Sequence, residues 1–469
     1  MPPAACDVLY VHPTKTPTST DYSIMPVGVF SIVNLLIANG YDVRGINLGV
    51  ERSLDRGYDL AARLRDAPGR ALLIDLHWYE HAYGAIEVAR LAKQAAPGVP
   101  VVIGGFTATV YAREILEQFD CVDYVVKGDS EEPTLALIEH LLRGRGSLED
   151  VPNVSFRAGA AAVDRRISYR RRDLEGLDFV SSAFLEHREH YYFTAANGIQ
   201  RAKPSNFWLA VARGCSFECE YCSGSRRNND PLFGSPAVVK RSPEALARDI
   251  LRLARMGVRT FSPTHDLQMF GRAWYEPLFA AVRAGSPRPG VYHECFQLPQ
   301  PQFLAGLHAA FDPRHTTVVL SPLCADERLR RANGKGFSNA RYFETLDWLA
   351  ERQVPIELFY SMNLLGDDEG SFERTLAQID EVAARLAGRP LTIYCQPVSL
   401  DPLAPMRDHV TAQLNTFRDY YEYCRADVAA RPGYDGVEEL VAQRTAVYAA
   451  FKARMRARRP SGGVPLRIF

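Results

Sequence analysis

Three cysteines, Cys215, Cys219 and Cys222, are the residues whose type and spacing point most directly to chemistry in this chain. They have the order C-x3-C-x2-C and directly follow the apolar run 207–212, which predicts a short buried strand. The cysteines are therefore expected on the loop at the carboxyl end of that strand. Three thiolates from one short loop can hold three irons of a four-iron cluster and leave the fourth iron open. An open iron is a position where a cofactor can bind and receive an electron.

A structural role is the alternative for these cysteines, because their spacing also places them on one face of an α-helix, where cysteine serves as a small core residue. Gly214 and the polar residues between the cysteines disfavour a packed helical face: Ser216, Glu218 and Glu220. The other six cysteines are scattered without ligand spacing and are expected to be ordinary buried thiols: Cys6, Cys121, Cys295, Cys324, Cys395 and Cys424.

The cysteine motif resembles the signature of the radical S-adenosylmethionine (SAM) superfamily, which has an aromatic residue just before the last cysteine. Cys215, Cys219, Tyr221 and Cys222 fit that signature. The resemblance implies that the three cysteines are the catalytic cluster ligands and that Tyr221 lies at the cofactor. It implies a [4Fe-4S] cluster whose open iron is chelated by the amino and carboxylate groups of SAM. Reductive cleavage would then give a 5′-deoxyadenosyl radical, with electrons from an external donor of the flavodoxin or ferredoxin type.

Length and composition predict a multidomain globular protein. A chain of 469 residues exceeds one ordinary core, so two or three domains are expected. Lys+Arg and Asp+Glu are both 55, so the net charge is zero. A neutral chain has no overall electrostatic attraction to nucleic acid or to an anionic membrane. Residues 1–7 show no secretory signal, and no apolar run reaches the length of a membrane span. We therefore expect a cytoplasmic, monomeric enzyme with reduced cysteines.

The first part of the chain alternates strand-like and helix-like segments. Strands are expected at 7–11, 41–48, 71–76, 99–103 and 124–128, and helices at 27–40, 84–96, 110–118 and 132–142. This alternation predicts a doubly wound parallel sheet, in which ligands bind beyond the carboxyl ends of the strands. The candidate cofactor-binding residues follow those strand ends: Pro13, Thr14, His77, Trp78, Tyr79, Gly104, Gly105, Phe106, Thr107, Gly128, Asp129, Ser130 and Glu131. On the residues alone, the paired glycines fit a simple turn equally well.

Residues 1–145 are also similar to a Rossmann-like cobalamin-binding domain, on the runs 100–105 and 122–132. Domains that ligate cobalt through histidine carry D-x-H-x-x-G after the first strand, whereas residues 12–17 read HPTKTP. The segment Asp75-Leu76-His77 matches the first half of that motif, but it follows the third strand and Glu80 replaces the glycine. The resemblance therefore implies base-off cobalamin. His77 is a minor candidate for the lower cobalt face and is favoured more as a residue that lines the pocket.

Residues 146–205 are expected to be a connector, with a hairpin at 153–163 and a solvated basic run at 165–172. From 206 to 405, strands are expected at 207–212, 258–262, 291–296, 316–320, 356–360 and 391–396, and helices at 243–256, 274–284, 338–352 and 371–386. These units fit the partial (β/α)6 barrel of the radical SAM superfamily, with chemistry at the carboxyl ends of the strands. Residues 406–469 are expected to form a helical C-terminal region that caps the barrel.

Polar residues at the ends of the expected barrel strands are further candidates for SAM contacts. In the family, the loop after the second strand holds the methionine part of SAM; here Thr264, His265 and Asp266 occupy it in place of the usual acidic pair. Ser321 stands where the family presents a serine near the ribose. The loop beginning at Gly366 resembles the family's loop after the fifth strand without its proline. Each of these residues fits equally well as a turn former or a helix cap.

The two resemblances together imply a cobalamin-dependent radical SAM methyltransferase. Such enzymes use a [4Fe-4S] cluster, SAM and cobalamin to alkylate carbon or phosphorus of small-molecule natural products. Three alternatives stay open: ring contraction, cyclisation or carbon–carbon coupling without methyl transfer; polar methyl transfer; and a cobalamin or iron–sulfur sensor without catalysis. A methylthiotransferase is disfavoured, because the first domain offers only Cys6 and Cys121. The sequence names no substrate beyond a small metabolite, with a lipid as the second choice.

Overall fold

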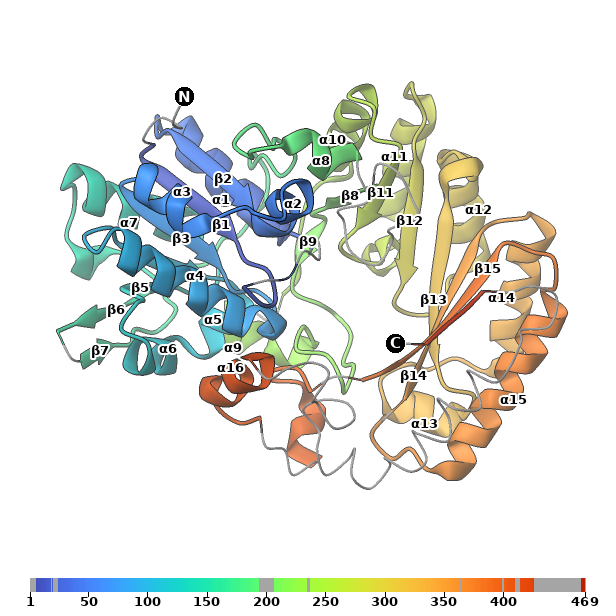
Figure 1. The fold of residues 1–469 in the computed structure, drawn as a ribbon. Coiled ribbons are helices and arrows are strands. Elements are labelled where there is room, and N and C mark those ends of the chain that lie inside the picture. The colour runs from blue at the N-terminus through green and yellow to red at the C-terminus, as the bar shows by residue number, and fades with distance from the viewer. Residues whose placement is uncertain are drawn as a thin grey trace. The chain divides into compact units, whose positions relative to one another are not determined.

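The computed structural model describes residues 6–17, 19, 24–159, 161–193, 206–233, 237–362, 364–398, 400–409, 414–425 and 465–468. The chain divides into two compact units (Figure 1). The first unit contains Met1–Asn206, Asn229–Val239 and Leu414–Ala430, and the second contains Phe207–Asn228, Lys240–Gln413 and Arg431–Phe469.

A seven-stranded sheet with the order β2-β1-β3-β4-β5-β6-β7 forms the centre of the first unit. Strands β1 to β5 are parallel, and the hairpin of β6 and β7 continues the sheet antiparallel to β5. The five parallel strands and the hairpin were both predicted from the sequence. The strands are β1 (Val8–His12), β2 (Val43–Asn47), β3 (Ala71–Asp75), β4 (Val101–Gly104), β5 (Tyr124–Val126), β6 (Val154–Ala158) and β7 (Ala161–Val163).

Helices cover both faces of this sheet, because side chains of successive strand residues point to opposite faces. Tyr10 of β1 and Phe30 of α1 both contact the ring of Phe184, while Leu9 and Val11 belong to the core under α3, α4 and α6. Helix α7 packs beside α1. The helical segments are α1 (Val27–Ala38), α2 (Leu48–Leu54), α3 (Leu60–Asp66), η1 (Tyr79–His81), α4 (Ala82–Ala95), α5 (Phe106–Val110), α6 (Ala112–Gln118), α7 (Glu131–Arg143), η2 (Leu148–Asp150), α8 (Arg188–Phe193), α9 (Asn229–Phe233) and α16 (Phe417–Arg425).

Helix α16 differs from the sequence expectation, which assigned its aromatic stripe to a cap on the barrel. The helix packs against α4, α6 and η1 of the first unit. Phe417 lies 5.6 Å from Phe119 between ring centroids, and Tyr420 lies 5.0 Å from Tyr79. Aromatic rings of the first unit therefore bury the apolar face of α16. Among the other described residues of the expected helical region, β16 (Leu466–Ile468) is a strand that pairs in parallel with β15.

The second unit is built on a sheet with the order β16-β15-β14-β13-β12-β11-β8. The neighbouring strands from β11 to β16 are parallel, and the six strands predicted for a partial barrel are all present. These strands are β8 (Asn206–Leu209), β11 (Thr260–Pro263), β12 (Gly290–Cys295), β13 (Thr317–Leu323), β14 (Ile356–Met362) and β15 (Leu391–Pro397). Two short strands lie outside this sheet, β9 (Ala212–Arg213) and β10 (Val239–Lys240).

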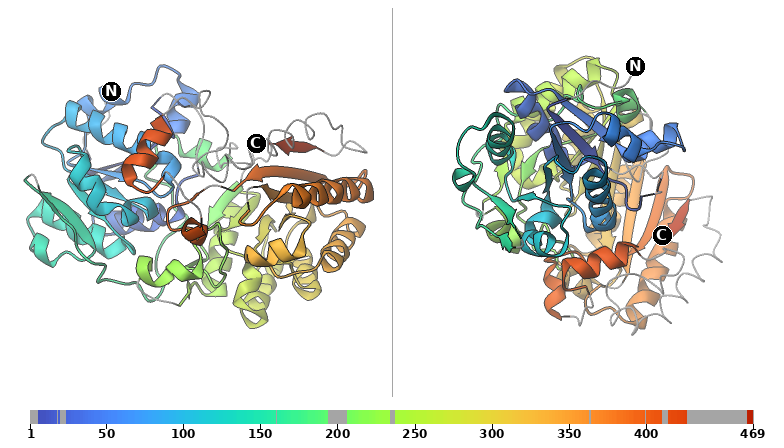
Figure 2. Two further views of the ribbon diagram at one scale, coloured as in Figure 1. Left: turned by 90° about the horizontal axis from the view of Figure 1, so that it is seen from below. Right: turned by 60° about the vertical axis from the view of Figure 1, so that its left-hand side comes forward.

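Helices alternate with these strands and lie on the outer side of the sheet (Figure 2). Helix α10 shows why the sequence folds this way: Ser242 caps its first turn by accepting the Ala245 N–H, and Pro243 fits the first helical position. The helical segments are η3 (Arg226–Asn228), α10 (Pro243–Arg255), η4 (Leu267–Phe270), α11 (Arg272–Ala284), α12 (Pro301–Ala310), η5 (Pro313–His315), α13 (Glu327–Ala332), α14 (Asn339–Glu351), α15 (Glu369–Arg385) and η6 (Pro405–His409).

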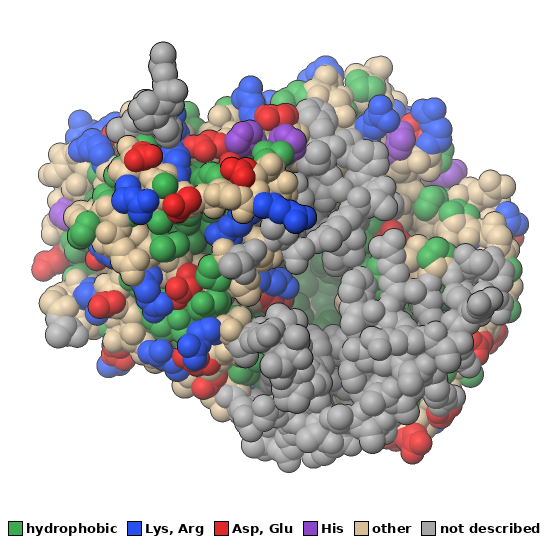
Figure 3. Space-filling model, viewed as in Figure 1, with side chains coloured by type: hydrophobic (Ala, Val, Ile, Leu, Met, Phe, Trp, Pro, Cys, Tyr) green, Lys and Arg blue, Asp and Glu red, His purple; other side chains and the backbone are tan. Residues whose placement is uncertain are grey.

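Charged side chains of both signs are interspersed over the described residues of the face drawn in Figure 3. This mixture agrees with a net charge of zero. Within the described ranges, no helix combines the length and the apolar character needed to cross a membrane.

Candidate functional site

The three cysteines of the motif lie on one irregular loop between β9 and η3 in the second unit. All three are half-buried free thiols. The loop begins at Gly214, whose φ of 79° turns the chain out of β9. The Phe217 N–H lies 3.4 Å from Cys215 Sγ, and the Cys222 N–H donates to the Cys219 carbonyl at 3.3 Å. The segment is not helical, so the alternative of a packed helical face is wrong.

A second segment of the same unit, residues 402–406, braces the cysteine loop from the side. The Asn228 side-chain amide donates to the Ser223 carbonyl at 2.9 Å and to the Leu403 carbonyl at 2.8 Å. The Met406 N–H donates to the Glu220 carbonyl at 2.8 Å. These bonds hold the backbone on both sides of Cys222.

His265, a predicted SAM-binding residue, holds the turn that precedes Cys215. Its Nε2 lies 3.0 Å from the Gly214 carbonyl and its Nδ1 lies 3.0 Å from Thr264 Oγ1, which also accepts the Val211 N–H at 3.1 Å. Burial lowers the pKa of His265 to about 4, so the ring is neutral near pH 7. The carbonyl can only accept, and this network therefore assigns the proton to Nε2.

Asp266, the next predicted residue, is 1% exposed and uses both carboxylate oxygens on the backbone. It accepts the Gln268 N–H and the Phe296 N–H, each at 3.0 Å. Burial raises its pKa to about 6, against the lowering effect of these bonds. Asp266 therefore caps η4 and ties it to the end of β12.

The loop Asn333–Gly336 touches the cysteine loop and was not singled out in the sequence. A Cβ at Gly334 would lie 2.8 Å from both the Cys219 Cα and the Glu218 carbonyl oxygen, so only glycine allows this approach. Gln297 holds the loop: its amide nitrogen donates to the Gly334 carbonyl at 2.8 Å. In the sequence, this loop is marked only by a lysine between two glycines. That local pattern does not predict contact with the cysteine loop.

Lys335 places a buried amine in this part of the barrel. It is 4% exposed, and its electrostatic neighbours include Cys219, Asp266 and Glu294. Burial lowers the pKa of Lys335, while these acidic neighbours oppose that shift. Burial also raises the pKa of Glu294 to about 7. Ionisable groups that can carry either sign of charge are therefore buried together beside the cysteine loop.

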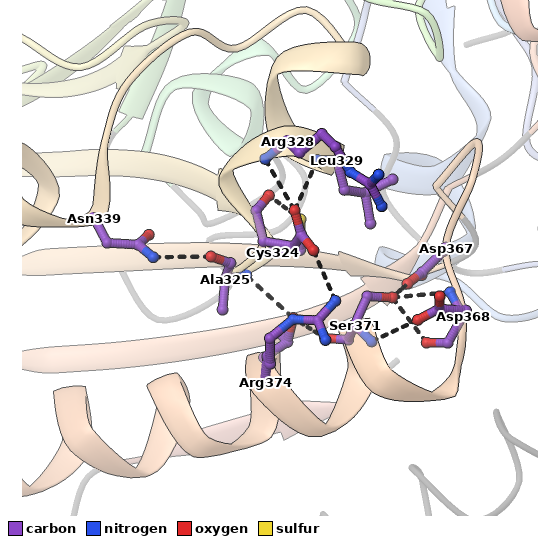
Figure 4. A network of polar contacts seen from close by, with 11 residues as sticks. Cys324, Ala325, Arg328, Leu329, Asn339, Asp367, Asp368, Ser371 and Arg374 are labelled. Carbon is purple, nitrogen blue, oxygen red and sulfur yellow. Dashed lines mark hydrogen bonds and ion pairs between the residues drawn. The ribbon is translucent and has the colours of Figure 1, made fainter.

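A polar network fixes the loops that follow β13 and β14 (Figure 4). Asp326 accepts the Leu329 N–H at 3.0 Å and pairs with Arg374 of α15 at 2.7 Å. The Asn339 amide donates to the Ala325 carbonyl at 2.9 Å. The network anchors the start of α13, and the end of α13 leads directly into the loop that carries Lys335.

Three predicted residues of the barrel remain. Tyr221 is half-buried and packs against the core cluster that includes Leu323 and Leu400. Ser321 and Gly366 have fewer contacts. Ser321 is half-buried in β13, where the pairing with β14 shifts between Leu320 and Leu323. Gly366 is exposed with a φ of 85°. The residue before it is tied to the Lys335 loop, because the Asn333 amide donates to the Leu365 carbonyl at 3.1 Å.

In the first unit, the carboxyl ends of β3, β4 and β5 bring several predicted residues to one edge of the sheet. The His77 ring lies 4.8 Å from the Trp78 ring and 6.1 Å from the Phe106 ring between centroids. Thr107 donates to the His77 carbonyl from both its N–H, at 3.1 Å, and its hydroxyl, at 2.9 Å. The half-exposed members of this edge are His77, Trp78, Gly104, Gly105, Phe106 and Gly128. Burial lowers the pKa of His77 to about 4, so its ring is neutral.

The remaining predicted residues of the first unit are buried, and several have their side chains engaged by the protein. Tyr79 packs against Tyr420, Asp129 accepts the Arg171 N–H at 2.8 Å, and Glu131 accepts the Ser31 hydroxyl at 2.6 Å. Arg52 donates to the Thr14 hydroxyl at 2.8 Å. The buried residues are Pro13, Thr14, Tyr79, Thr107, Asp129, Ser130 and Glu131.

Replacing Gly84 by alanine is expected to destabilise the first unit. Its Cβ would lie 1.8 Å from the Thr14 carbonyl oxygen, so either α4 or the segment after β1 must move. We expect the free energy of unfolding to fall by about 1–3 kcal/mol or more, as for other overpacked sites. Urea unfolding followed by circular dichroism measures it. Gly28→Ala is the matched control, because a Cβ there meets nothing within 4 Å and alanine favours the helix. Equal losses of unfolding free energy in the two variants would contradict a steric clash at Gly84.

Residues 18–138 match the model of the B12-binding domain. The chain is 23% identical over 253 residues to the hopanoid C-3 methylase of Methylococcus capsulatus. The aligned region covers 54% of this chain and 45% of that protein. It is 27% identical over 169 residues to the anaerobic magnesium-protoporphyrin IX monomethyl ester cyclase of Cereibacter sphaeroides, covering 36% of this chain and 26% of the relative. The chain therefore spans less than half the length of these curated relatives.

The fold is similar to that of the radical SAM methyltransferase TsrM from Kitasatospora setae, solved with tryptophan and a SAM analogue. The TM-score is 0.68 at 16% identity, covering 95% of this chain and 88% of TsrM. The chain thus has the fold of the cobalamin-dependent radical SAM enzymes, with a B12-binding domain in the first unit and a partial barrel in the second. This confirms the fold predicted from the sequence.

Proposed function

We propose that this chain is a cobalamin-dependent radical SAM methyltransferase that alkylates an unactivated carbon, or a phosphorus, of a small molecule. One observation carries the proposal. Three free thiols share one loop at the carboxyl end of parallel barrel strands, in a chain that also contains a B12-binding domain. The similarity to a hopanoid methylase and to TsrM supports methyl transfer among the reactions open to this architecture.

The residues of the cysteine loop fit a [4Fe-4S] cluster. Burial raises the pKa of Cys215 and raises that of Cys222 to about 12, so the protein alone does not favour thiolates at these positions. A metal that replaces the thiol protons removes this penalty. The Phe217 N–H beside Cys215 Sγ is a donor suited to a metal-bound sulfur, and such bonds tune iron–sulfur sites. When bound, the cluster supplies the electron that cleaves SAM, and cobalamin carries the methyl group.

The chain's own residues then position the reactants. Cys215, Cys219 and Cys222 are the proposed cluster ligands, and His265 keeps the turn before them in place through the Gly214 carbonyl. Lys335 adjoins Gly334, which meets Cys219, and when protonated its amine favours an electron-rich cluster. For SAM we propose Tyr221, Ser321 and Gly366 as contacts. We assign His265 and Asp266, whose polar atoms bond to other protein groups, to the SAM site as residues that hold its loops.

For cobalamin we propose the half-exposed edge of the first unit, which offers backbone at three glycines and the rings of His77, Trp78 and Phe106. Aromatic side chains pack against a large ring system. Gly105 and Gly128 also let the unit's own backbone come close, because a Cβ there would lie 2.7 Å from the Leu76 carbonyl oxygen and 3.1 Å from the Leu232 carbonyl oxygen. The proposed partners are a small-molecule substrate and an electron donor of the flavodoxin or ferredoxin type, and the proposed compartment is the cytoplasm.

Radical cyclisation without methyl transfer is the second candidate, favoured by the similarity to the anaerobic cyclase of Cereibacter sphaeroides. Both reactions begin with SAM cleavage at the cysteine loop. They differ in the fate of a second SAM molecule, because only methyl transfer converts it to S-adenosylhomocysteine. Counting the two adenosyl products against the substrate consumed therefore separates the two candidates.

The test is anaerobic reconstitution of the full chain with iron, sulfide and cobalamin, followed by turnover with a reductant and candidate substrates. Tryptophan is one candidate, because TsrM was solved with it. We expect S-adenosylhomocysteine, 5′-deoxyadenosine and a methylated product together. Conversion without S-adenosylhomocysteine would favour cyclisation. S-adenosylhomocysteine without 5′-deoxyadenosine would indicate polar methyl transfer. Cofactor binding with no adenosyl product from any candidate would favour a sensor.

A further inference from the structure

Two histidines and one aspartate converge inside the first unit, next to the half-exposed edge described above, since the His81 ring lies 6.0 Å from the Trp78 ring between centroids. His12 ends β1, Asp75 ends β3, and His81 lies in η1. One potential ligand atom from each of the three lies within 4.8 Å of the others. Their side chains are 0%, 5% and 2% exposed, respectively. Buried polar groups of this kind require partners, so their hydrogen bonds decide what the cluster can do.

The hydrogen bonds within the cluster satisfy only one oxygen of the aspartate. His12 Nδ1 lies 2.8 Å from Asp75 Oδ1, and the Tyr10 hydroxyl donates to the same oxygen at 2.6 Å. Among the described residues, Asp75 Oδ2 and His81 Nδ1 have no hydrogen-bond partner. A buried polar atom of this kind destabilises the fold if it stays unpaired. Two unpaired atoms on adjacent side chains indicate that something else binds there.

The donors match a divalent transition metal ion. Imidazole nitrogen and carboxylate oxygen together suit Zn²⁺ and Fe²⁺, and two histidines with one carboxylate leave coordination positions open. Metal–ligand bonds of about 2.0–2.2 Å place neighbouring ligand atoms roughly 3–3.5 Å apart. The observed limit of 4.8 Å therefore needs only small side-chain rotations to close around an ion. Burial lowers the pKa of His81 to about 3, which keeps its ring in the neutral form that ligates metals.

We propose that His12, Asp75 and His81 bind one divalent transition metal ion of the zinc or ferrous class. Asp75 contributes Oδ2 and His81 contributes Nδ1, while the Tyr10 hydroxyl orients the carboxylate through Oδ1. The ion joins the ends of β1 and β3 to the start of α4. It therefore stabilises the strand ends next to the proposed cobalamin edge, and it is a site separate from the cysteine loop.

Zinc binding tests the proposal on the full chain with Cys215, Cys219 and Cys222 all replaced by alanine, so that no cluster contributes metal. The parent is stripped with a chelator and titrated with Zn²⁺ alone in competition with a chromophoric chelator. We expect one zinc equivalent that is absent in the His81→Ala and Asp75→Asn variants. Tyr10→Phe should still bind one equivalent of zinc, with an affinity lower by about 10–100-fold. His140→Ala is the matched control in the same unit, since its ring bonds to the Gly146 carbonyl instead.

Three outcomes would overturn the proposal: no zinc equivalent in a folded parent, an unchanged equivalent in His81→Ala and Asp75→Asn, or stoichiometric release of zinc when hydroxocobalamin binds. The last outcome would assign the three residues to the cobalamin pocket. Circular dichroism of each variant distinguishes the loss of a metal ligand from the loss of the fold. If His81→Ala does not fold, the zinc affinity of Tyr10→Phe still tests the site. Cobalamin binding and adenosyl products are measured separately, so failure here leaves methyl transfer untouched.

Discussion

Replacing Cys219 by alanine is expected to abolish reductive cleavage of SAM. The thiol is one of three on the loop, and two remaining thiolates hold a four-iron cluster poorly. We expect the iron and sulfide content of the reconstituted chain to fall to background, and 5′-deoxyadenosine formation to drop at least ~100-fold, or ~2.7 kcal/mol in the barrier. Elemental analysis, the visible absorption of the cluster and product counting measure these effects under anaerobic conditions.

The matched control for this variant is Cys121→Ala. Cys121 is also a cysteine outside any disulfide, but it is only 4% exposed and lies in the core of the first unit. Burial raises the pKa of Cys121 to about 11, so it remains a thiol without a metal. Its loss should cost about 1 kcal/mol of stability and leave the cluster intact. A full cluster in Cys219→Ala, or an equal loss in Cys121→Ala, would contradict the assignment of the cysteine loop.

The strands and the cysteine loop could be predicted from the sequence because their signals are local. Apolar runs of four to seven residues bounded by glycine, proline or polar residues mark buried parallel strands. The spacing of Cys215, Cys219 and Cys222, with Gly214 before them, indicates a ligand loop. The structure keeps both features. Helices α2, α3, α12 and α13 were not predicted, because their apolar periodicity extends over only a few turns. Asn47, Asp59 and Asp326 nevertheless cap three of them.

The partners of an apolar face cannot be predicted in the same way. The aromatic stripe of α16 correctly indicated a buried face, but periodicity does not say which surface covers it. The structure pairs Phe417 with Phe119 and Tyr421 with Glu87, whose carboxylate accepts the tyrosine hydroxyl at 3.0 Å. These contacts join segments that are distant in the sequence. The choice between the barrel and the first unit therefore depended on tertiary packing.

Position at a strand end also proved too coarse to separate ligand-binding residues from structural ones. Asp129 and Glu131 follow β5 as expected for a cofactor site, yet they accept hydrogen bonds from Arg171 and Ser31. His12 and Asp75 end neighbouring strands and meet each other inside the unit. Side chains along a strand point alternately to the two faces of the sheet. Whether a residue at a strand end faces a ligand therefore depends on the face to which it points and on the segments that pack over it.

The contact of Gly334 and Lys335 with the cysteine loop could not be predicted from the sequence either. Their loop follows α13, whose start is anchored at Asp326, and Gly334 comes close to Cys219. The sequence presents them as an ordinary glycine-rich turn. The structure shows that the turn is a contact surface for the cysteine loop, and it yields a prediction that is independent of the cysteines themselves.

Replacing Gly334 by alanine is expected to remove most of the cluster without touching a ligand. The added Cβ would lie 2.8 Å from the Cys219 Cα and from the Glu218 carbonyl oxygen, and neither backbone atom belongs to a flexible side chain. The φ of 95° adds strain for any residue with a Cβ. Either the cysteine loop or the Lys335 loop must move, at a cost of about 1–3 kcal/mol. We expect iron per chain and 5′-deoxyadenosine to fall at least about tenfold, which corresponds to ~1.4 kcal/mol.

Gly336→Ala is the control two residues away on the same loop. Gly336 is exposed, a Cβ there meets nothing within 4 Å, and its N–H remains available to Gln297 Oε1 at 3.4 Å. This variant should therefore keep its iron and its SAM cleavage. If Gly334→Ala retained a full cluster, the close approach to Cys219 would have no role in cluster binding. If both variants lost iron equally, the cause would be general loosening of the loop. Loss in Gly334→Ala alone would show that the cysteine loop depends on a neighbour that its own motif does not contain.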